Sequence, residues 1–181
     1  MITNKQELKE YLKADYPKLT KKNLFVKWIT CTDDYYVIIF MRCLRYYEYY
    51  SNKKKNVFDY IPFLWYWWNY RRLRRKSNIF IEKNCVGPGC KILHPGFRRI
   101  GPYVKIGKNC TILPMVLIGK RDLNVVSPVM VLGDNCYIGK GATIVGPIHI
   151  GNNVTIGAHS FVNKDVPDNA VVGGVPAKIL K

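Results

Sequence analysis

The sequence lacks the features that mark secreted and membrane-spanning proteins. Its longest apolar stretches with almost no charge, 35–41 and 60–70, are far shorter than the roughly 20 residues that a membrane-spanning helix needs. The first residues, MITNKQELKEYLK, are polar and contain no apolar core of a signal peptide. We therefore expect a cytoplasmic protein.

Metal-binding patterns are also missing. None of the six cysteines forms a C-x-x-C pair, and none of the three histidines stands at zinc-finger spacing, so we expect no metal site. Disulfides are not expected either, because proteins without a secretion signal stay in reducing compartments.

Acidic residues are scarce. The 181 residues include 29 Lys and Arg against 12 Asp and Glu, a net charge of +17. This excess predicts an anionic partner: nucleic acid, a phosphorylated cofactor or an anionic membrane surface. With 48% hydrophobic residues, the chain is not disordered, and its length predicts one principal domain with a smaller appendage.

An aliphatic residue recurs every six positions through the second half of the chain. Of the eleven intervals between successive leading residues, nine are six, one is 8 and one is 14. Six residues make one short strand and a tight bend, so three units predict one triangular coil that stacks on its neighbours. The leading residues, expected to point inward, are Val86, Ile92, Ile100, Ile106, Ile112, Ile118, Leu132, Ile138, Ile144, Ile150, Ile156 and Val162.

A second position of the repeat is small. The fourth residue after the leading one is expected near a corner of the coil, where only a small side chain fits. Cys90, Cys110 and Cys136 are therefore interpreted as core-lining residues. The same position is occupied elsewhere by Val104, Val116, Ala142, Ile148, Val154 and Ser160.

This hexapeptide pattern, with the ending VVGGVPAKIL, resembles the left-handed parallel β-helix acyltransferases. The resemblance covers residues 78–181 and implies a mainly β domain. It also implies a homotrimer, or a dimer of trimers, with acetyl-CoA in a groove between adjacent β-helices. Residues 1–77 lack the repeat and are expected to form an α-helical N-terminal region, with helices at 6–16 and 33–50 and a turn at SNKKKN.

His94 is the candidate catalytic residue. It stands in ILHPGF, 24 residues before Ile118, and the 14-residue interval that follows leaves room for a loop at 119–131. This arrangement is similar to serine acetyltransferases, and that resemblance implies that His94 is the catalytic base. A neutral imidazole suits the role, because a hydroxyl attacks a thioester poorly until its proton is removed. The alternative is a surface histidine without a chemical role.

The other two histidines are expected on exposed faces of late coils. A γ-class carbonic anhydrase would share the fold, but it needs three histidines around one zinc ion. His94, His149 and His159 are too scattered along the repeats for that arrangement.

Two departures from the serine acetyltransferase pattern bear on the acceptor. That family has an aspartate where this chain has Leu93, and a second histidine where it has Val129. Losing a carboxylate that pairs with a substrate ammonium costs about 1.5–3 kcal/mol. No aspartate matches the carboxylate that orients the histidine, so Glu82 is the candidate substitute.

We therefore expect an acetyl-CoA-dependent O-acetyltransferase whose acceptor is a sugar hydroxyl of surface-polysaccharide biosynthesis. Serine acetylation for cysteine biosynthesis is the close alternative, and a non-catalytic β-helix scaffold is the third. The resemblance implies that coenzyme A contacts a loop start, two small-residue turns and a terminal lysine. These candidates are Gly119, Lys120, Arg121, Gly141, Ala142, Gly157, Ala158 and Lys178.

A basic aromatic run occupies residues 60–76. Aromatic residues dominate 60–70, and five of the six residues 71–76 are basic. One interpretation is a helix whose aromatic side chains pack on the β-helix or on another subunit. The second is peripheral contact with the inner face of a membrane, with tryptophans at the headgroup level and arginines on anionic lipid. Nucleic acid is not expected as a partner, because no recognition motif accompanies the run.

Overall fold

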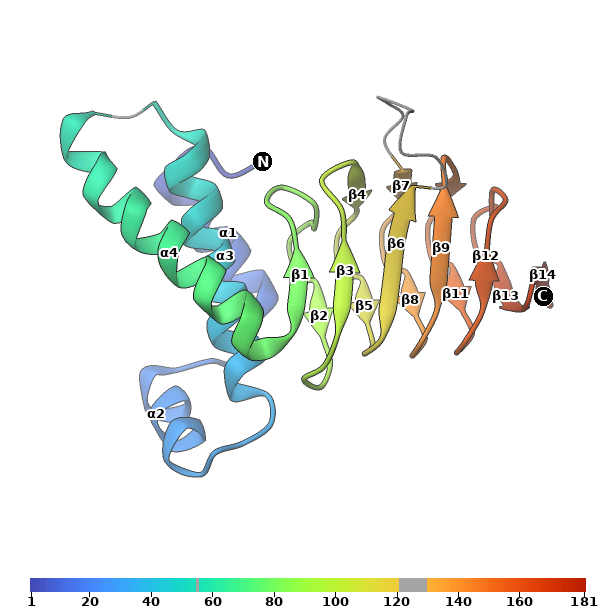
Figure 1. Cartoon of the computed structure of the whole chain (residues 1–181), viewed down its shortest axis with the longest axis horizontal. Coiled ribbons are helices and arrows are strands. Elements are labelled where there is room, and N and C mark those ends of the chain that lie inside the picture. Colours follow the sequence, from blue (N-terminus) through green and yellow to red (C-terminus); the bar gives the residue numbers. More distant parts are fainter. Residues whose placement is uncertain (55, 121–129) are drawn as a thin grey trace.

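The computed structural model describes residues 1–54, 56–120 and 130–181. Helices come first in the chain and a stack of short strands follows (Figure 1). The helices are α1 (Lys5–Asp15), α2 (Lys21–Ile29), α3 (Tyr35–Asn52), the 3-10 helix η1 (Val57–Asp59) and α4 (Tyr60–Ser77). Asn4 and Thr20 cap α1 and α2 through side-chain oxygens that accept from backbone N–H groups. None of the described helices is long and apolar enough to cross a membrane.

The strands form three sheets, one for each side of a triangular coil. Sheet A contains β1 (Ile79–Ile81), β3 (Arg98–Ile100), β6 (Val116–Lys120), β9 (Thr143–Gly146) and β12 (Phe161–Val162). Sheet B contains β4 (Val104–Ile106), β7 (Met130–Leu132) and β10 (His149–Ile150). Sheet C contains β2 (Lys91–Ile92), β5 (Thr111–Ile112), β8 (Tyr137–Ile138), β11 (Thr155–Ile156), β13 (Val171–Gly174) and β14 (Ala177–Ile179).

The hexapeptide register predicted the packing correctly. Parallel pairing stacks the same repeat position from coil to coil. Ile138, for example, pairs with Ile112 in one neighbouring coil and with Ile156 in the other. All twelve leading residues and all nine predicted corner residues are buried. The parallel register ends at β14, which pairs antiparallel with β13.

A ladder of asparagines follows the corner between sheets B and C. Asn109, Asn135, Asn153 and Asn169 all have left-handed φ values of 56–62°. Their side-chain amides are hydrogen-bonded in sequence along the stack, at 3.4, 3.1 and 3.0 Å. Asparagine tolerates this backbone conformation better than most residues, and glycine, which tolerates it best, takes the same corner of the first coil as Gly89 with a φ of 74°.

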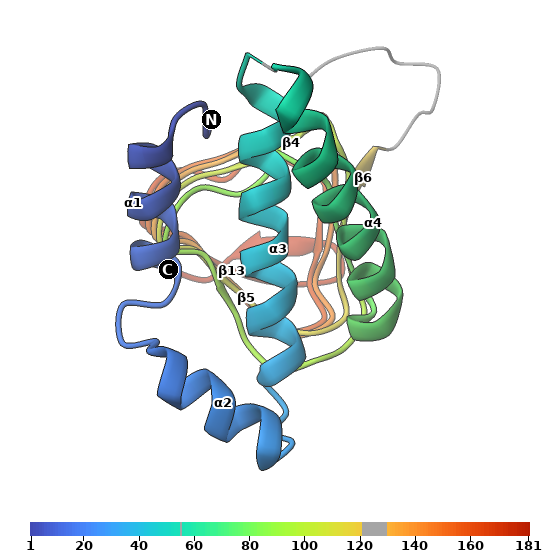
Figure 2. The same ribbon diagram turned by 90° about the vertical axis from the view of Figure 1, so that its left-hand side faces the viewer.

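The helices cover one end of the coil stack. Viewed along the stack, α3 crosses its end, with α1 and α4 on either side (Figure 2). Residues of α3 and α4 join the coils in one apolar core. The helix α2, which the sequence did not predict, contributes no buried residue.

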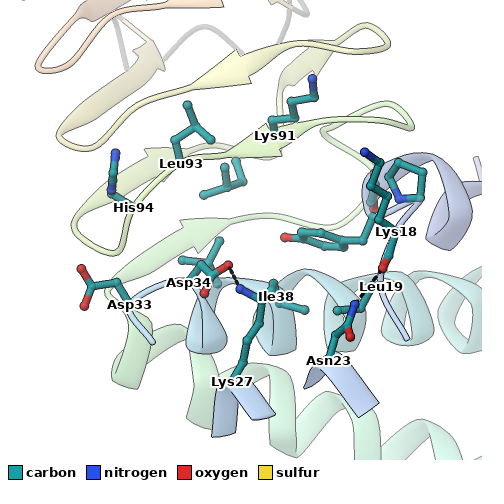
Figure 3. Close-up of a pocket in the computed structure, with 15 residues that line it drawn as sticks. Lys18, Leu19, Asn23, Lys27, Asp33, Asp34, Ile38, Lys91, Leu93 and His94 are labelled. Atoms are coloured by element: carbon teal, nitrogen blue, oxygen red, sulfur yellow. Dashed lines mark hydrogen bonds and ion pairs between the residues drawn. The ribbon is translucent and has the colours of Figure 1, made fainter. Parts of the chain in front are cut away.

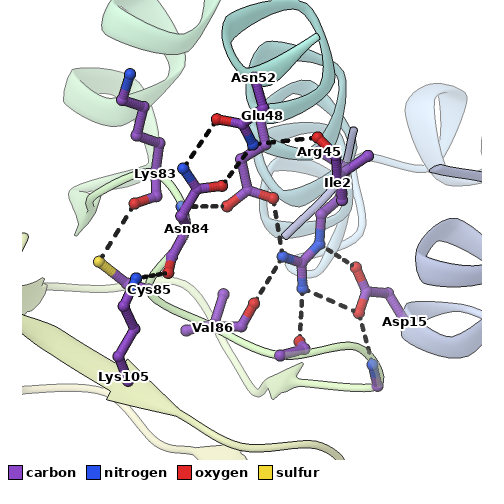
Figure 4. A network of polar contacts seen from close by, with 12 residues as sticks. Ile2, Asp15, Arg45, Glu48, Asn52, Lys83, Asn84, Cys85, Val86 and Lys105 are labelled. Carbon is purple, nitrogen blue, oxygen red and sulfur yellow. Dashed lines mark hydrogen bonds and ion pairs between the residues drawn. The ribbon is translucent and has the colours of Figure 1, made fainter. Parts of the chain in front are cut away.

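A buried ionic network joins this helical region to the first coil (Figure 4). The Arg45 guanidinium of α3 donates to the Asp15 and Glu48 carboxylates at 2.8 and 3.0 Å. It also donates to the backbone oxygens of Val86 and Gly87, both at 2.8 Å. Arg45 therefore fixes how the helices sit on the β-helix.

Candidate functional site

His94 stands on a corner that is wider than its neighbours. Strand pairing aligns Ile92 with Ile112 and Arg98 with Val116 in the next coil. Five residues lie between Ile92 and Arg98, whereas only three lie between Ile112 and Val116. The two extra residues let the corner project outward. His94 lies on it with a left-handed φ of 60° and an exposed side chain.

Arg98 fills the space behind this corner. It occupies the slot that Val116 fills in the next coil, and it is fully buried. Its guanidinium donates to the backbone oxygens of His94 and Gly96 at 2.8 and 3.1 Å, and to that of Leu93. Three carbonyls of the His94 corner are thus held by one side chain.

The charge of Arg98 has no acidic partner among the described residues. Its Nε atom is buried and makes no hydrogen bond. Burial lowers the pKa of Arg98 to about 10. Burying a guanidinium without an acidic partner costs free energy, which implies that the conformation of the His94 corner depends on Arg98.

A cavity of about 540 Å³ lies between the first coil and the helices (Figure 3). Leu93 and His94 bound it on the coil side. Ile38, Asp34 and Asp33, from α3 and the residues before it, bound it on the helical side. The site therefore belongs to both parts of the chain.

The two aspartates of the cavity differ in their state of pairing. Asp34 accepts from Lys27 at 2.5 Å and from Thr32 at 2.8 Å. Partial burial raises the pKa of Asp34, but these hydrogen bonds outweigh burial and lower the pKa below its usual range. Asp33 is exposed and lies across the mouth of the cavity from His94 (Figure 3).

Polar groups at the other end of the cavity complete the lining. Lys18 and Lys91 lie there, away from Asp33 (Figure 3). The Tyr16 hydroxyl is buried and has no hydrogen-bond partner. Burial raises the pKa of Tyr16, so this hydroxyl stays protonated at neutral pH and can donate.

Glu82 does not take the role suggested for it. It forms an ion pair with Arg74 at 2.9 Å and lies after β1, at the corner between sheets A and B. His94 stands at the corner between sheets C and A, so Glu82 cannot orient it.

The candidate coenzyme A residues fall at separate places. Gly141, Gly157 and Ala158 lie on the edge between sheets C and A that also carries His94. Backbone hydrogen bonds link that edge from coil to coil, including Met115 to Phe97 at 2.6 Å and Gly141 to Pro114 at 2.9 Å.

The remaining candidates lie elsewhere. Ala142 is buried, so it shapes the edge without reaching solvent. Gly119 and Lys120 stand at the far end of β6, where the Lys120 ammonium lies 4.6 Å from the Tyr103 ring centroid. Lys178 is exposed on β14. Arg121 and Val129 lie outside the described residues.

His149 and His159 are exposed, as predicted. In the described part of the chain, no group of three His, Cys, Asp or Glu residues is arranged to hold a metal ion. The sequence analysis missed Asp33, Tyr16 and Arg98. Only Arg98 left a signal, because it stands where other units carry a small residue.

Known proteins share both the repeat and the architecture. Residues 130–164 match the family of bacterial transferase hexapeptide, six repeats. Serine acetyltransferase from Staphylococcus aureus strain Mu50 is 37% identical over 109 residues, which cover 53% of this chain and 48% of that protein. The chain thus spans about half of that relative's length.

Two solved structures extend the likeness to the helical region. Serine acetyltransferase from Neisseria gonorrhoeae in complex with serine is 24% identical, with a TM-score of 0.68 over 96% of this chain and 69% of that one. A serine acetyltransferase in complex with CoA is 21% identical, with a TM-score of 0.69 over 97% of this chain and 71% of that one. The chain therefore has the left-handed β-helix that its hexads predict, and among hexapeptide-repeat acyltransferases it resembles the serine acetyltransferases in sequence and fold.

Proposed function

We propose that the protein is an acetyl-CoA-dependent O-acetyltransferase in which His94 is the general base. The observation that carries this proposal is the place of His94, on a projecting corner at the mouth of a 540 Å³ cavity. The edge that carries His94 continues along the coils past Gly141 and Gly157, where partly exposed backbone can receive the pantetheine arm of the donor.

The chemistry is direct transfer. The acceptor oxygen attacks the thioester carbonyl carbon while the His94 imidazole takes the hydroxyl proton. The tetrahedral intermediate then breaks its C–S bond, and the departing thiolate receives the proton from the imidazolium. The products are the acetyl ester and coenzyme A.

We propose serine, or a similar small amino alcohol, as the first acceptor. The solved relative that binds serine supports this choice, and so does Asp33. Its exposed carboxylate, across the mouth of the cavity from His94, can pair with a substrate ammonium and so replace the contact that Leu93 removes.

A sugar hydroxyl of surface-polysaccharide biosynthesis is the second acceptor. Leu93 favours it, because this side chain is 41% exposed and presents an apolar surface where the serine-specific family has an acid. A neutral sugar has no ammonium to pair, so it does not need Asp33.

We further propose that the chain works in the cytoplasm as a homotrimer with the donor between neighbouring β-helices. The relative solved with CoA supports the donor. The six free cysteines suit a reducing compartment. One protomer supplies only one wall of such a groove, and Lys178 would meet the phosphates of the donor there.

The test is thiol release from acetyl-CoA with serine and with a panel of sugars and nucleotide sugars. His94→Ala should lower turnover by about 10²–10⁴-fold, the usual contribution of a general base. His149→Ala, which removes an exposed histidine from sheet B, is the matched control and should leave turnover unchanged. Full activity of His94→Ala would overturn the mechanism.

Asp33→Asn separates the two acceptors. If serine is the acceptor, this change should raise KM for serine and leave KM for acetyl-CoA unchanged, because the ammonium loses its carboxylate. Turnover with a sugar alone, insensitive to Asp33→Asn, would establish the second acceptor.

A further inference from the structure

The helix α4 divides its aromatic residues between two faces. On one face, Tyr66 stacks on Tyr46 of α3 with ring centroids 4.8 Å apart, and Tyr70 stacks on Tyr47 at 5.0 Å. The sequence analysis offered packing on the β-helix or on another subunit as one interpretation of these aromatic residues. The aromatic residues that pack inward do so mainly on α3.

The opposite side, called here the α4 outer face, remains uncovered. Its members recur every three or four positions, the spacing of one helix face. Phe58 is 87% exposed, Ile61 76% and Trp65 62%. The apolar half consists of Phe58, from the 3-10 helix η1 just before α4, with Ile61, Leu64, Trp65 and Trp68, and the basic half consists of Arg71, Arg72 and Arg75.

The basic half continues the apolar half without an acidic residue. No Asp or Glu occurs in residues 60–77. The Arg71 and Arg72 guanidinium groups lie over the Trp67 and Trp68 rings, at 4.9 and 5.8 Å from the centroids. These contacts orient the cations along the same side as the indoles.

A basic hollow borders the outer face. A cavity of about 460 Å³ is lined by Trp67, Trp68, Arg71, Arg74, Arg75 and Phe80. Glu82 neutralises Arg74 at 2.9 Å. Arg71 and Arg75 have no ion pair among the described residues, so the hollow suits a phosphate group between aromatic walls.

We propose that the α4 outer face docks on an anionic lipid bilayer. The apolar half enters the boundary between headgroups and acyl chains, with the tryptophans at headgroup depth. The arginines bind lipid phosphates, one of which occupies the hollow. The helix lies in the interface and does not span the bilayer.

Charge selects this partner over a second copy of the chain. Pairing two outer faces would bring their arginine groups together, and the whole chain carries +17. Like charges at such a contact are destabilising. An anionic membrane supplies both the apolar layer and the opposite charge, and this inference does not depend on the proposed acetyl transfer.

The test measures binding of the full chain to vesicles of phosphatidylglycerol and phosphatidylcholine by co-sedimentation. Binding should need the anionic lipid and weaken as salt rises. Replacing Arg72→Gln and Arg75→Gln together should weaken binding about thirtyfold, since each cation near the surface contributes roughly fivefold. The double change Trp65→Ser with Trp68→Ser should abolish the part of vesicle binding that persists at high salt.

The helix α2 provides the matched controls. Trp28 is 57% exposed there, close to the exposure of Trp65 and Trp68, and Lys21 and Lys22 carry the same charge as the two arginines. Trp28→Ser and the double change Lys21→Gln with Lys22→Gln should leave vesicle binding unchanged. Circular dichroism confirms that each variant keeps its helices.

Three results would overturn the proposal. One is the absence of binding to anionic vesicles by the unaltered chain. Another is an equal loss of binding in the α2 controls, which would make the interaction a general effect of charge and exposed aromatic residues. The third is a smaller assembly mass in the α4 variants by light scattering with vesicle binding intact, which would assign the face to another protomer.

Discussion

At the scale of single residues, Arg98 holds the backbone of the His94 corner through hydrogen bonds to three of its carbonyl oxygens. A buried cation is costly, and within the described residues this one is balanced by the dipoles of three carbonyls in the His94 corner. We expect it to set the position of the His94 backbone. It does not touch substrate, so it is a positioning residue.

We predict that Arg98→Met lowers kcat with acetyl-CoA at least about tenfold while KM for acetyl-CoA changes little, because displacement of a base by 1 Å can cost about 10²-fold. Arg98→Lys should recover part of the loss, since an ammonium reaches fewer of the three carbonyls. Steady-state kinetics measures both values.

Arg99 is the control, because it is exposed on the outward side of the same strand. Arg99→Gln should keep the kcat of the unaltered protein. If Arg98→Met retains full kcat, or if Arg99→Gln loses as much, the positioning role is wrong.

At single residues, the sequence analysis singled out His94 as a candidate and missed the residues that share its cavity. His94 carried a signal in the chain because its hexad and the long interval after it are local features. Asp33 stands 61 residues earlier, and only the packing of α3 on the first coil brings it to the same cavity. A local sequence pattern therefore could not predict that Asp33 and His94 line the same cavity.

At the scale of elements, the contact between α3 and the first coil depends on Arg45. Two buried carboxylates, Asp15 and Glu48, share this cation. Arg45→Met would leave both carboxylates buried without a cation, each with only a backbone N–H donor from Gly89 or Asn84. Removing one partner of a buried pair destabilises by about 3–5 kcal/mol, and we expect that loss in the free energy of unfolding.

Denaturant unfolding followed by circular dichroism gives the measurement. Arg42→Met, one turn earlier on α3 and only partly buried, is the control and should change stability by about 0.5 kcal/mol or less. Equal stability of the Arg45 and Arg42 variants would contradict the network's role.

The elements also show where sequence patterns are informative. Every residue that the hexads predicted to point inward is buried, because each unit buries the same position, but Cys85, Arg98 and Met130 are also buried in the coils and were not predicted. The helix α2 has no buried residue, yet its sequence places Leu24, Phe25, Trp28 and Ile29 at the spacing of one helix face, a signal that the sequence analysis did not use. Its cap at Thr20 was a further signal.

At the scale of the whole molecule, the proposed trimer has a direct test. Light scattering should give three times the 21.0 kDa of one chain, or six times for a pair of trimers. A mass of one chain at assay concentration would exclude a donor groove between protomers, and the donor would then have to bind on a single β-helix.

The two ends of the coil stack differ in a way that limits its growth. Stacked parallel coils expose the same hydrogen-bonding edge wherever they stop, and such edges invite another chain to add on. Here helices cover the first coil, and β14 reverses direction on β13. A new coil cannot continue the parallel register of that sheet. The stack therefore does not extend end to end with coils of other chains, although stacked parallel strands are also the architecture of fibres.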